Sequence, residues 1–280
     1  MLGAIAGDII GSVYEFESQK TKNFPLFTDQ SIFTDDTILT VAVADVLIHG
    51  GTYTAAFKRY YQRYPNPCGG YGARFQAWAA SIDSQPYNSW GNGAAMRVSP
   101  VAYVHQNLTA VLLSAKQTAV ATHNHPEGIK GAQATASAIF LARQGQSKEN
   151  IKQYVETMFG YDLSRSLEQI RPDYQFNESC QETVPQAIIA FLESTSFTDA
   201  IRNAVSLGGD ADTLTCITGS IAEAFYGEIP EAITDHVWRL LPDHLKTIIV
   251  QFKAAYMPLL KSVANQSMPL VKHIGEKHDV

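Results

Sequence analysis

Cysteine is scarce in this chain, and its sparse distribution excludes several classes of protein. The three cysteines, Cys68, Cys180 and Cys216, are scattered among 280 residues and form no C-x-x-C pair. A disulfide framework and a zinc knuckle are therefore excluded as organising features, and a reducing, cytoplasmic setting is favoured. The opening stretch MLGAIAGDII has no basic segment, and Asp8 interrupts its apolar run, which argues against a signal peptide.

Long hydrophobic runs and basic runs are also lacking. No stretch of about 18 apolar residues occurs, so the sequence predicts no membrane-spanning helix. The formal net charge is −6, the isoelectric point is near 5.7 and no Lys/Arg stripe occurs, so we expect no nucleic-acid partner. Hydrophobic residues make up 45% and charged residues 17% of the chain, which is typical of a globular protein rather than a disordered one.

Alternating patterns typical of β-strands are lacking, whereas helical periodicity recurs along the chain. We expect helices over residues 34–49, 110–122, 130–143 and 213–227, and two helices separated by a Ser/Thr break within 188–208. Long connections are expected over residues 17–32 and 161–183. Because nothing marks a domain boundary, the sequence predicts one compact all-α, multi-helix domain over residues 1–280. Residues 228–280 contain no motif to which we assign a role.

Glycines recur at every fourth position of the first helical segment. Gly3, Gly7 and Gly11 would lie on one face, and each costs about 1 kcal/mol of helix propensity. We expect the close approach of a neighbouring helix to offset this cost, and helix packing alone would explain the glycines. Asp8 and Glu15, which are seven residues apart, share that face and indicate a polar site beside it.

Two predicted helices begin with doubled carboxylates. FTDDT spans residues 33–37, and SLGGDADT spans residues 206–213. Helix capping is one explanation, but a single acid would suffice for it. Adjacent carboxylates and threonine hydroxyls are hard oxygen ligands suited to Mg²⁺ or Ca²⁺. If the two helix starts face each other, four acids would repel strongly unless cations lie between them, so the residues alone favour a site for one or two metal ions.

Two further motifs have features of ligand-binding segments. SWGNGAAMR (89–97) is a glycine-rich turn before a helix, whose backbone N–H groups could bind phosphate, although a simple turn and cap explain it as well. THNHPE (122–127) holds two histidines with no third His or Cys nearby. One of them could bind a ligand hydroxyl or phosphate, or both could belong to a capped helix junction. No G-x-S-x-G nucleophile motif is present.

The order of these motifs, GAIAGDIIGS, FTDDT, SWGNGAAMR, THNHP and SLGGDADTL, resembles the ADP-ribosylglycohydrolase family over roughly residues 3–227. The resemblance implies an all-α fold with two Mg²⁺ ions, or Mn²⁺ in some members, at the base of a cleft. By motif position, one ion would be held by Thr34, Asp35 and Asp36, and the other by Asp210, Asp212 and Thr213, with Asp212 a candidate bridge. The ADP-ribose diphosphate and the neighbouring ribose would be held by Gly91, Asn92, Gly93 and His123.

The resemblance also implies an activity. The protein would be a metal-dependent hydrolase that cleaves the N- or O-glycosidic bond between ADP-ribose and an acceptor, which is a protein side chain or a small molecule, and releases ADP-ribose. We expect Glu15 to assist proton transfer, with Asp36 as the second candidate. Glu15 matches the glutamate of the serine-ADP-ribose hydrolase branch and so inclines the assignment slightly toward that branch. Asp8 would hydrogen-bond helix N-termini, and residues 17–32 would form a lid.

Two other functions remain open at this point. One is a catalytically inactive protein that binds ADP-ribose or a nucleotide on the same scaffold. The other is a metal-dependent nucleotide diphosphatase, whose product would be AMP. The sequence leaves open the acceptor linkage, the choice between Mg²⁺ and Mn²⁺, and the oligomeric state, for which a monomer is the starting expectation.

Overall fold

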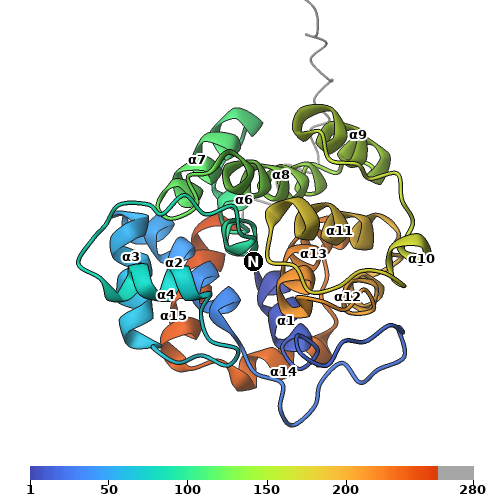
Figure 1. The fold of residues 1–280 in the computed structure, drawn as a ribbon, viewed down its shortest axis with the longest axis horizontal. Coiled ribbons are helices and arrows are strands. Elements are labelled where there is room, and N and C mark those ends of the chain that lie inside the picture. Colours follow the sequence, from blue (N-terminus) through green and yellow to red (C-terminus); the bar gives the residue numbers. More distant parts are fainter. Residues whose placement is uncertain (258–280) are drawn as a thin grey trace, which may run out of the picture.

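The protein is helical, as the sequence predicts (Figure 1). The computed structural model describes residues 1–257, in which there are fifteen α-helices and no β-strand. In chain order the helices are α1 (Leu2–Gly11), α2 (Asp35–His49), α3 (Tyr53–Arg63), α4 (Ala73–Ala80), α5 (Gly93–Met96), α6 (Val101–Val104), α7 (Leu108–Val120), α8 (Pro126–Arg143), α9 (Lys148–Phe159), α10 (Leu167–Ile170), α11 (Cys180–Leu192), α12 (Phe197–Val205), α13 (Ala211–Tyr226), α14 (Glu231–Leu240) and α15 (Asp243–Tyr256). Within this part of the chain no helix is long and apolar enough to span a membrane.

The expected helices are confirmed, with shifts of a few residues at their ends. The 34–49 pattern corresponds to α2, 110–122 to α7, 130–143 to the main part of α8, and 213–227 to α13. The two helices expected within 188–208 are the end of α11 and α12. The long connection expected over 161–183 is wrong in part, because α10 interrupts it and α11 begins at Cys180. Ser166 forms a capping box with Gln169 at α10, and Ser179 caps α11.

The glycine face of α1 packs directly on α13, and this is the most extensive helix contact in the described structure. A Cβ added to Gly7 would lie 2.0 Å from the carbonyl oxygen of Thr215, and one added to Gly3 would lie 2.3 Å from the carbonyl oxygen of Gly219. The Thr215 hydroxyl donates a hydrogen bond of 2.8 Å to the Gly7 carbonyl oxygen. The expected close approach of a neighbouring helix is therefore confirmed, and it explains why residues without side chains occupy this face.

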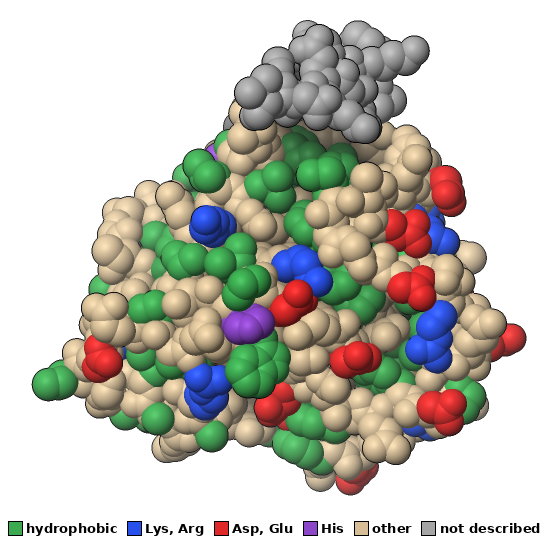
Figure 2. All heavy atoms as spheres, turned by 45° about the horizontal axis from the view of Figure 1, so that its top comes forward, with side chains coloured by type: hydrophobic (Ala, Val, Ile, Leu, Met, Phe, Trp, Pro, Cys, Tyr) green, Lys and Arg blue, Asp and Glu red, His purple; other side chains and the backbone are tan. Residues whose placement is uncertain are grey.

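Helices α1 and α13 lie near the middle of the molecule in Figure 1, with α11 and α12 on one side and α2, α3, α4 and α15 on the other. Every residue of α1 is buried, as are the first thirteen residues of α13. This arrangement brings the N-terminal ends of α2 and α13 to the same region, beside Asp8 of α1. The face drawn in Figure 2 shows basic side chains lying singly among acidic and apolar ones, without a basic stripe.

Candidate metal centre and cleft

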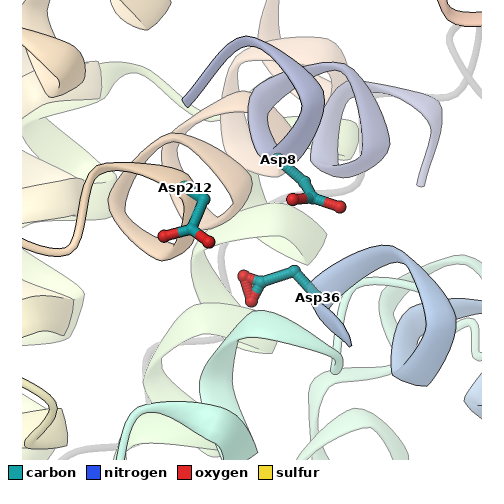
Figure 3. Close-up of side chains that lie close together, drawn as sticks. All are labelled: Asp8, Asp36 and Asp212. Carbon is teal, nitrogen blue, oxygen red and sulfur yellow. The ribbon is translucent and has the colours of Figure 1, made fainter. Parts of the chain in front are cut away.

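Three helices bring three carboxylates together in the interior. Asp8 of α1, Asp36 of α2 and Asp212 of α13 point toward one another, with one oxygen of each lying within 4.8 Å of the others (Figure 3). A second group of this kind consists of Glu15, Asp210 and Asp212. Asp212 belongs to both groups, so the five acids form one continuous cluster. The predicted convergence of the two acid-bearing helix starts is therefore what the structure shows.

Asp8 ties the first helix to the start of the second. Its carboxylate accepts hydrogen bonds from the backbone N–H groups of Thr34 and Thr37, each at 3.0 Å. It also accepts from the Thr34 hydroxyl at 2.7 Å and from the Thr37 hydroxyl. Burial raises the pKa of Asp8 to about 6, although these four donors oppose the shift. The expected role of Asp8 in binding a helix N-terminus is confirmed, and the same carboxylate also faces the acid cluster.

The cluster holds buried negative charge without a cationic side chain to balance it. Burial and then repulsion between neighbouring acids raise the pKa values of Asp35, Asp36 and Asp212 well above their ordinary value. No lysine, arginine or histidine in residues 1–257 forms an ion pair with any acid of the cluster. Buried carboxylates at this spacing are unfavourable unless they are protonated or bind a cation.

Glu15 lies just beyond the end of α1, at the wall of a cleft. Burial raises the pKa of Glu15 to about 7, and repulsion from Asp210, Asp8 and Glu178 adds to the shift. The loop at Gly69 passes close by, because a Cβ added there would lie 2.9 Å from Oε2 of Glu15. A carboxyl group with this pKa can both release and accept a proton near neutral pH, which suits a general acid or base.

The cleft has a volume of about 510 Å³ and is next to the acid cluster. Nine of the residues singled out from the sequence line it: Glu15, Asp35, Gly91, Asn92, Gly93, His123, Asp210, Asp212 and Thr213. Thr34 and Asp36 do not line it, and Asp36 is only 1% exposed. Of the two carboxylates predicted for proton transfer, Glu15 is therefore the one placed to reach a molecule in the cleft.

The two threonines of the predicted ligand sets are engaged with carboxylates. The Thr34 hydroxyl donates to Asp8, and the Thr213 hydroxyl donates to both carboxylate oxygens of Asp36, at 3.2 and 3.0 Å. Asp35 lines the cleft but belongs to neither three-carboxylate group. The groups also combine residues of both predicted sets, since Asp36 lies with Asp212. The division of these residues between two ions stays a prediction.

The glycine turn at residues 91–93 is held in place by hydrogen bonds of its own. The Asn92 side-chain amide donates to Asp210 Oδ2 at 2.6 Å and to the Thr183 hydroxyl at 3.1 Å. The Asn92 backbone N–H donates to the carbonyl oxygen of Glu178, and the Gly91 N–H donates to the Ser89 hydroxyl. Asn92 therefore orients an acid of the cluster, while a contact with a substrate at this turn stays a prediction.

Several parts of the cleft are not foreseen from the sequence. Residues 68–72 form part of its wall, together with Arg74, Phe16 and Phe176. The sequence signal for this wall is the glycine-rich stretch CGGYG. Phe16 and Phe176 stack with their ring centroids 6.5 Å apart, and both are exposed. Nothing in the sequence pairs them, because they come from loops 160 residues apart.

The segment expected to form a lid is attached elsewhere. No residue of 17–32 lines the cleft. Lys20 instead donates to the carbonyl oxygens of Tyr174 and Leu207, and Arg202 of α12 donates to those of Lys22 and Phe24. The part of this connection at the cleft is residues 15–16, directly after α1.

The sequence and the fold both assign the chain to a known family. Over residues 1–259 the sequence matches the ADP-ribosylglycohydrolase family, and the chain belongs to it. It is 25% identical to the human ADP-ribosylhydrolase ARH3 over 83% of this chain and 86% of that protein. It is 26% identical to the ADP-ribosylarginine hydrolase Tri1 of Pseudomonas putida, over 81% of this chain and 69% of that protein. A solved structure described as an ADP-ribosylglycohydrolase-related protein complex superposes with a TM-score of 0.68 and 26% identity, covering 90% of this chain and 95% of that one.

Proposed function

We propose that this protein hydrolyses the glycosidic bond that joins ADP-ribose to an acceptor and that it requires divalent metal ions to do so. The observation that carries the proposal is the convergence of acids from α1, α2 and the start of α13 on one cluster beside a cleft. Family membership supports the reaction class, and the relatives named ADP-ribosylhydrolase and ADP-ribosylarginine hydrolase support the kind of substrate.

The residues present fit divalent cations. The donor set is made of carboxylate and hydroxyl oxygens, which Mg²⁺ and Mn²⁺ prefer over nitrogen or sulfur. Burial and mutual repulsion raise the pKa values of Asp36 and Asp212, which supports a need for positive charge at the cluster. Two groups of three carboxylates sharing Asp212 support two ions, with Mg²⁺ as our first choice. Bound there, the ions would polarise ribose hydroxyls and lower the pKa of a water molecule.

The side chains of the chain perform the remaining tasks. Glu15 moves the proton, because its carboxyl group faces the cleft and titrates near neutral pH. Asn92 holds the carboxylate of Asp210 through its hydrogen bond, and Asp8 holds the start of α2, which bears Asp36. The turn at Gly91–Gly93 and His123 receive the diphosphate and the adjoining ribose, because these residues line the cleft. The bond that breaks is at the anomeric carbon of the distal ribose, through an oxocarbenium-like state.

Product analysis tests this proposal. The protein is incubated with arginine-, serine- and acetyl-linked ADP-ribose conjugates, with Mg²⁺ or with EDTA, and the released species are identified. We expect free ADP-ribose from at least one conjugate, lost with EDTA and in Asp210→Asn. Glu15→Gln should cut turnover strongly and leave ADP-ribose binding largely intact, because it removes the titrating group and keeps the size of the side chain.

The other two functions give different results in the same assay. A nucleotide diphosphatase would release AMP, and an inactive binding protein would bind ADP-ribose without releasing it from any conjugate. Unchanged turnover in Glu15→Gln would exclude Glu15 as the proton-transfer group. The conjugate that is cleaved would also name the linkage, for which Glu15 inclines us toward serine and other O-linked acceptors.

We further infer that the protein works as a monomer in the cytoplasm on ADP-ribosylated proteins or small molecules. All three cysteines are free thiols, and Cys68 is exposed, which supports a reducing compartment. Equilibrium sedimentation with and without Mg²⁺ would check the monomer.

A further inference from the structure

His123 is placed against the glycine turn of the cleft. It follows the end of α7, is 5% exposed, and lines the cleft. A Cβ added to Gly93 would lie 3.1 Å from Nε2 of His123, and one added to Gly91 would lie 3.5 Å away. The Nε2 edge of the ring therefore faces the turn, and the absence of side chains at both glycines leaves room for it there.

The other ring nitrogen of His123, Nδ1, contacts the side chain of Thr122. Nδ1 of His123 lies 2.7 Å from the hydroxyl oxygen of Thr122. That hydroxyl oxygen also accepts a hydrogen bond of 2.7 Å from Nη2 of Arg97. An arginine side chain only donates hydrogen bonds, so the hydroxyl proton of Thr122 stays free to be donated to another group. When that proton is donated to Nδ1 of His123, Nδ1 is unprotonated and Nε2 carries the hydrogen.

Arg97 is held through one of its three side-chain nitrogens. It is fully buried, its Nη2 also donates to the carbonyl oxygen of Thr118 at 3.1 Å, and its guanidinium lies 4.2 Å from the centre of the Phe57 ring. No carboxylate in residues 1–257 forms an ion pair with it. A buried cation without an anionic partner is costly, so a specific task is expected of it.

Burial and the positive charges of Arg97 and Arg74 lower the pKa of His123 well below its ordinary value. The ring is therefore neutral, and only one of its nitrogens can donate a hydrogen bond. The hydrogen-bond partner of one ring nitrogen determines whether the other ring nitrogen carries the hydrogen.

We propose that Arg97 and Thr122 are positioning residues that hold His123 as the Nε2–H tautomer, so that Nε2–H donates a hydrogen bond to an oxygen of the ADP-ribose unit at the glycine turn. The part concerning the ligand rests on the proposed function, whereas the part concerning the tautomer does not. Thr122 does not line the cleft and acts through His123, and Arg97, which also lies at the cleft wall, contributes through its hydrogen bond to Thr122.

The tautomer is tested without substrate, by ¹⁵N NMR of the histidine ring nitrogens in the full chain. His123→Gln assigns the signals. We expect a protonated Nε2 and an unprotonated, hydrogen-bonded Nδ1 in the wild-type protein. In Thr122→Val, which keeps the shape and removes the hydroxyl, the Nδ1 signal should move toward that of a free acceptor, and Thr122→Ser should restore it. A protonated Nδ1 in the wild type would overturn the proposal.

Thr118→Val is the matched control. Thr118 lies four residues earlier, in α7, is fully buried, and its hydroxyl donates to the carbonyl oxygen of Ala115. Its replacement removes a buried hydroxyl close to Arg97 without touching His123. We expect this variant to lose similar stability and to keep the wild-type ring signals, so that a merely structural effect of Thr122→Val would be recognised.

ADP-ribose binding, measured by calorimetry, tests the second part. Thr122→Val should bind about five- to tenfold more weakly, the range expected when a neutral hydrogen bond is misaligned, and Thr122→Ser and Thr118→Val should bind as the wild type does. Equal binding in Thr122→Val would overturn the donor role of His123. If the wild type bound no ADP-ribose while Nε2 carried the proton, the proposed function would fail and the tautomer assignment would stand.

Discussion

The close contact between α1 and α13 at the glycine face predicts a large loss of stability when a single methyl group is added to Gly7. In Gly7→Ala, the new methyl group would lie 2.0 Å from the carbonyl oxygen of Thr215 and 2.4 Å from its carbonyl carbon. Ordinary contacts of a Cβ begin at 3.4 Å, so the helices would have to separate by more than an ångström at this point. Both contacted atoms belong to the backbone of a buried helix, which cannot move aside as a flexible side chain could.

Three contributions set the size of the loss of stability, of which two are unfavourable and one is favourable. Overpacking against a rigid backbone costs about 3 kcal/mol, at the upper end of the usual range. Moving the helices apart also breaks the hydrogen bond from Thr215 to the Gly7 carbonyl oxygen, a loss of about 1 kcal/mol. Alanine regains about 1 kcal/mol of helix propensity. The net destabilisation is about 3 kcal/mol, which corresponds to a fall in Tm of about 6 to 12 °C for a chain of this size.

Thermal unfolding followed by circular dichroism, in Mg²⁺ and in EDTA, measures this effect. The stabilisation by Mg²⁺ should also shrink in Gly7→Ala, because the separation moves Asp8 of α1 away from Asp212 of α13. Gly72→Ala is the control, since no atom lies within 4 Å of its added Cβ, and its Tm should stay within about 2 °C of the wild type. A Tm of Gly7→Ala at or above that of the wild type would refute the packing argument.

Three further predictions concern the acid cluster. The pKa of Asp8 is raised from 3.8 to about 6, so between these pH values the folded protein holds a proton that the unfolded chain releases. The stability of the metal-free protein should therefore fall as the pH rises through this window. The difference in Tm between Mg²⁺ and EDTA should widen from pH 4 to 7, and a constant difference would contradict the prediction. Asp8→Asn leaves Thr34 and Thr37 short of acceptors, so it should cost about 2 kcal/mol in Mg²⁺ and less in EDTA, where it also relieves repulsion; urea unfolding measures both. Asn92→Ala releases Asp210 and should weaken apparent Mg²⁺ affinity about tenfold in a thermal-shift titration, a prediction that equal affinity would rule out.

The helical fold could be predicted from local patterns because its strongest signals are local. Ser and Thr caps, apolar periodicity and the glycines at positions 3, 7 and 11 are each read within a few residues, and all correspond to structure. The failure at 161–183 has the same origin, because Ser166 and Ser179 are caps of segments whose apolar periodicity is weak or interrupted by Pro185. Sequence also gave no means of pairing α1 with α13, since that partnership depends on the whole chain.

The candidate site was predictable as a set of residues but not as an arrangement. Doubled acids at two helix starts indicated that cations were needed, and the acids do converge. The directions of the hydrogen bonds could not be foreseen, because they depend on contacts across the fold. Asn92 donates to Asp210, and Thr213 donates to Asp36, so both bind acids of the cluster. Asp8 shows the same limit, since one carboxylate caps α2 and also faces the cluster.

Because the acid cluster lies among buried helices, metal binding is coupled to folding. Three of the five acids, Asp8, Asp36 and Asp212, belong to the buried parts of α1, α2 and α13, and not to surface loops that could move without cost. Repulsion among Asp36, Asp212 and their neighbours therefore opposes the close packing of the glycine face of α1 on α13. A bound cation removes that repulsion and is favoured by every contact that holds α1 against α13. Stability gained on adding metal is consequently a direct measure of how well the helices place the carboxylates, and it can be followed in variants that have no measurable activity.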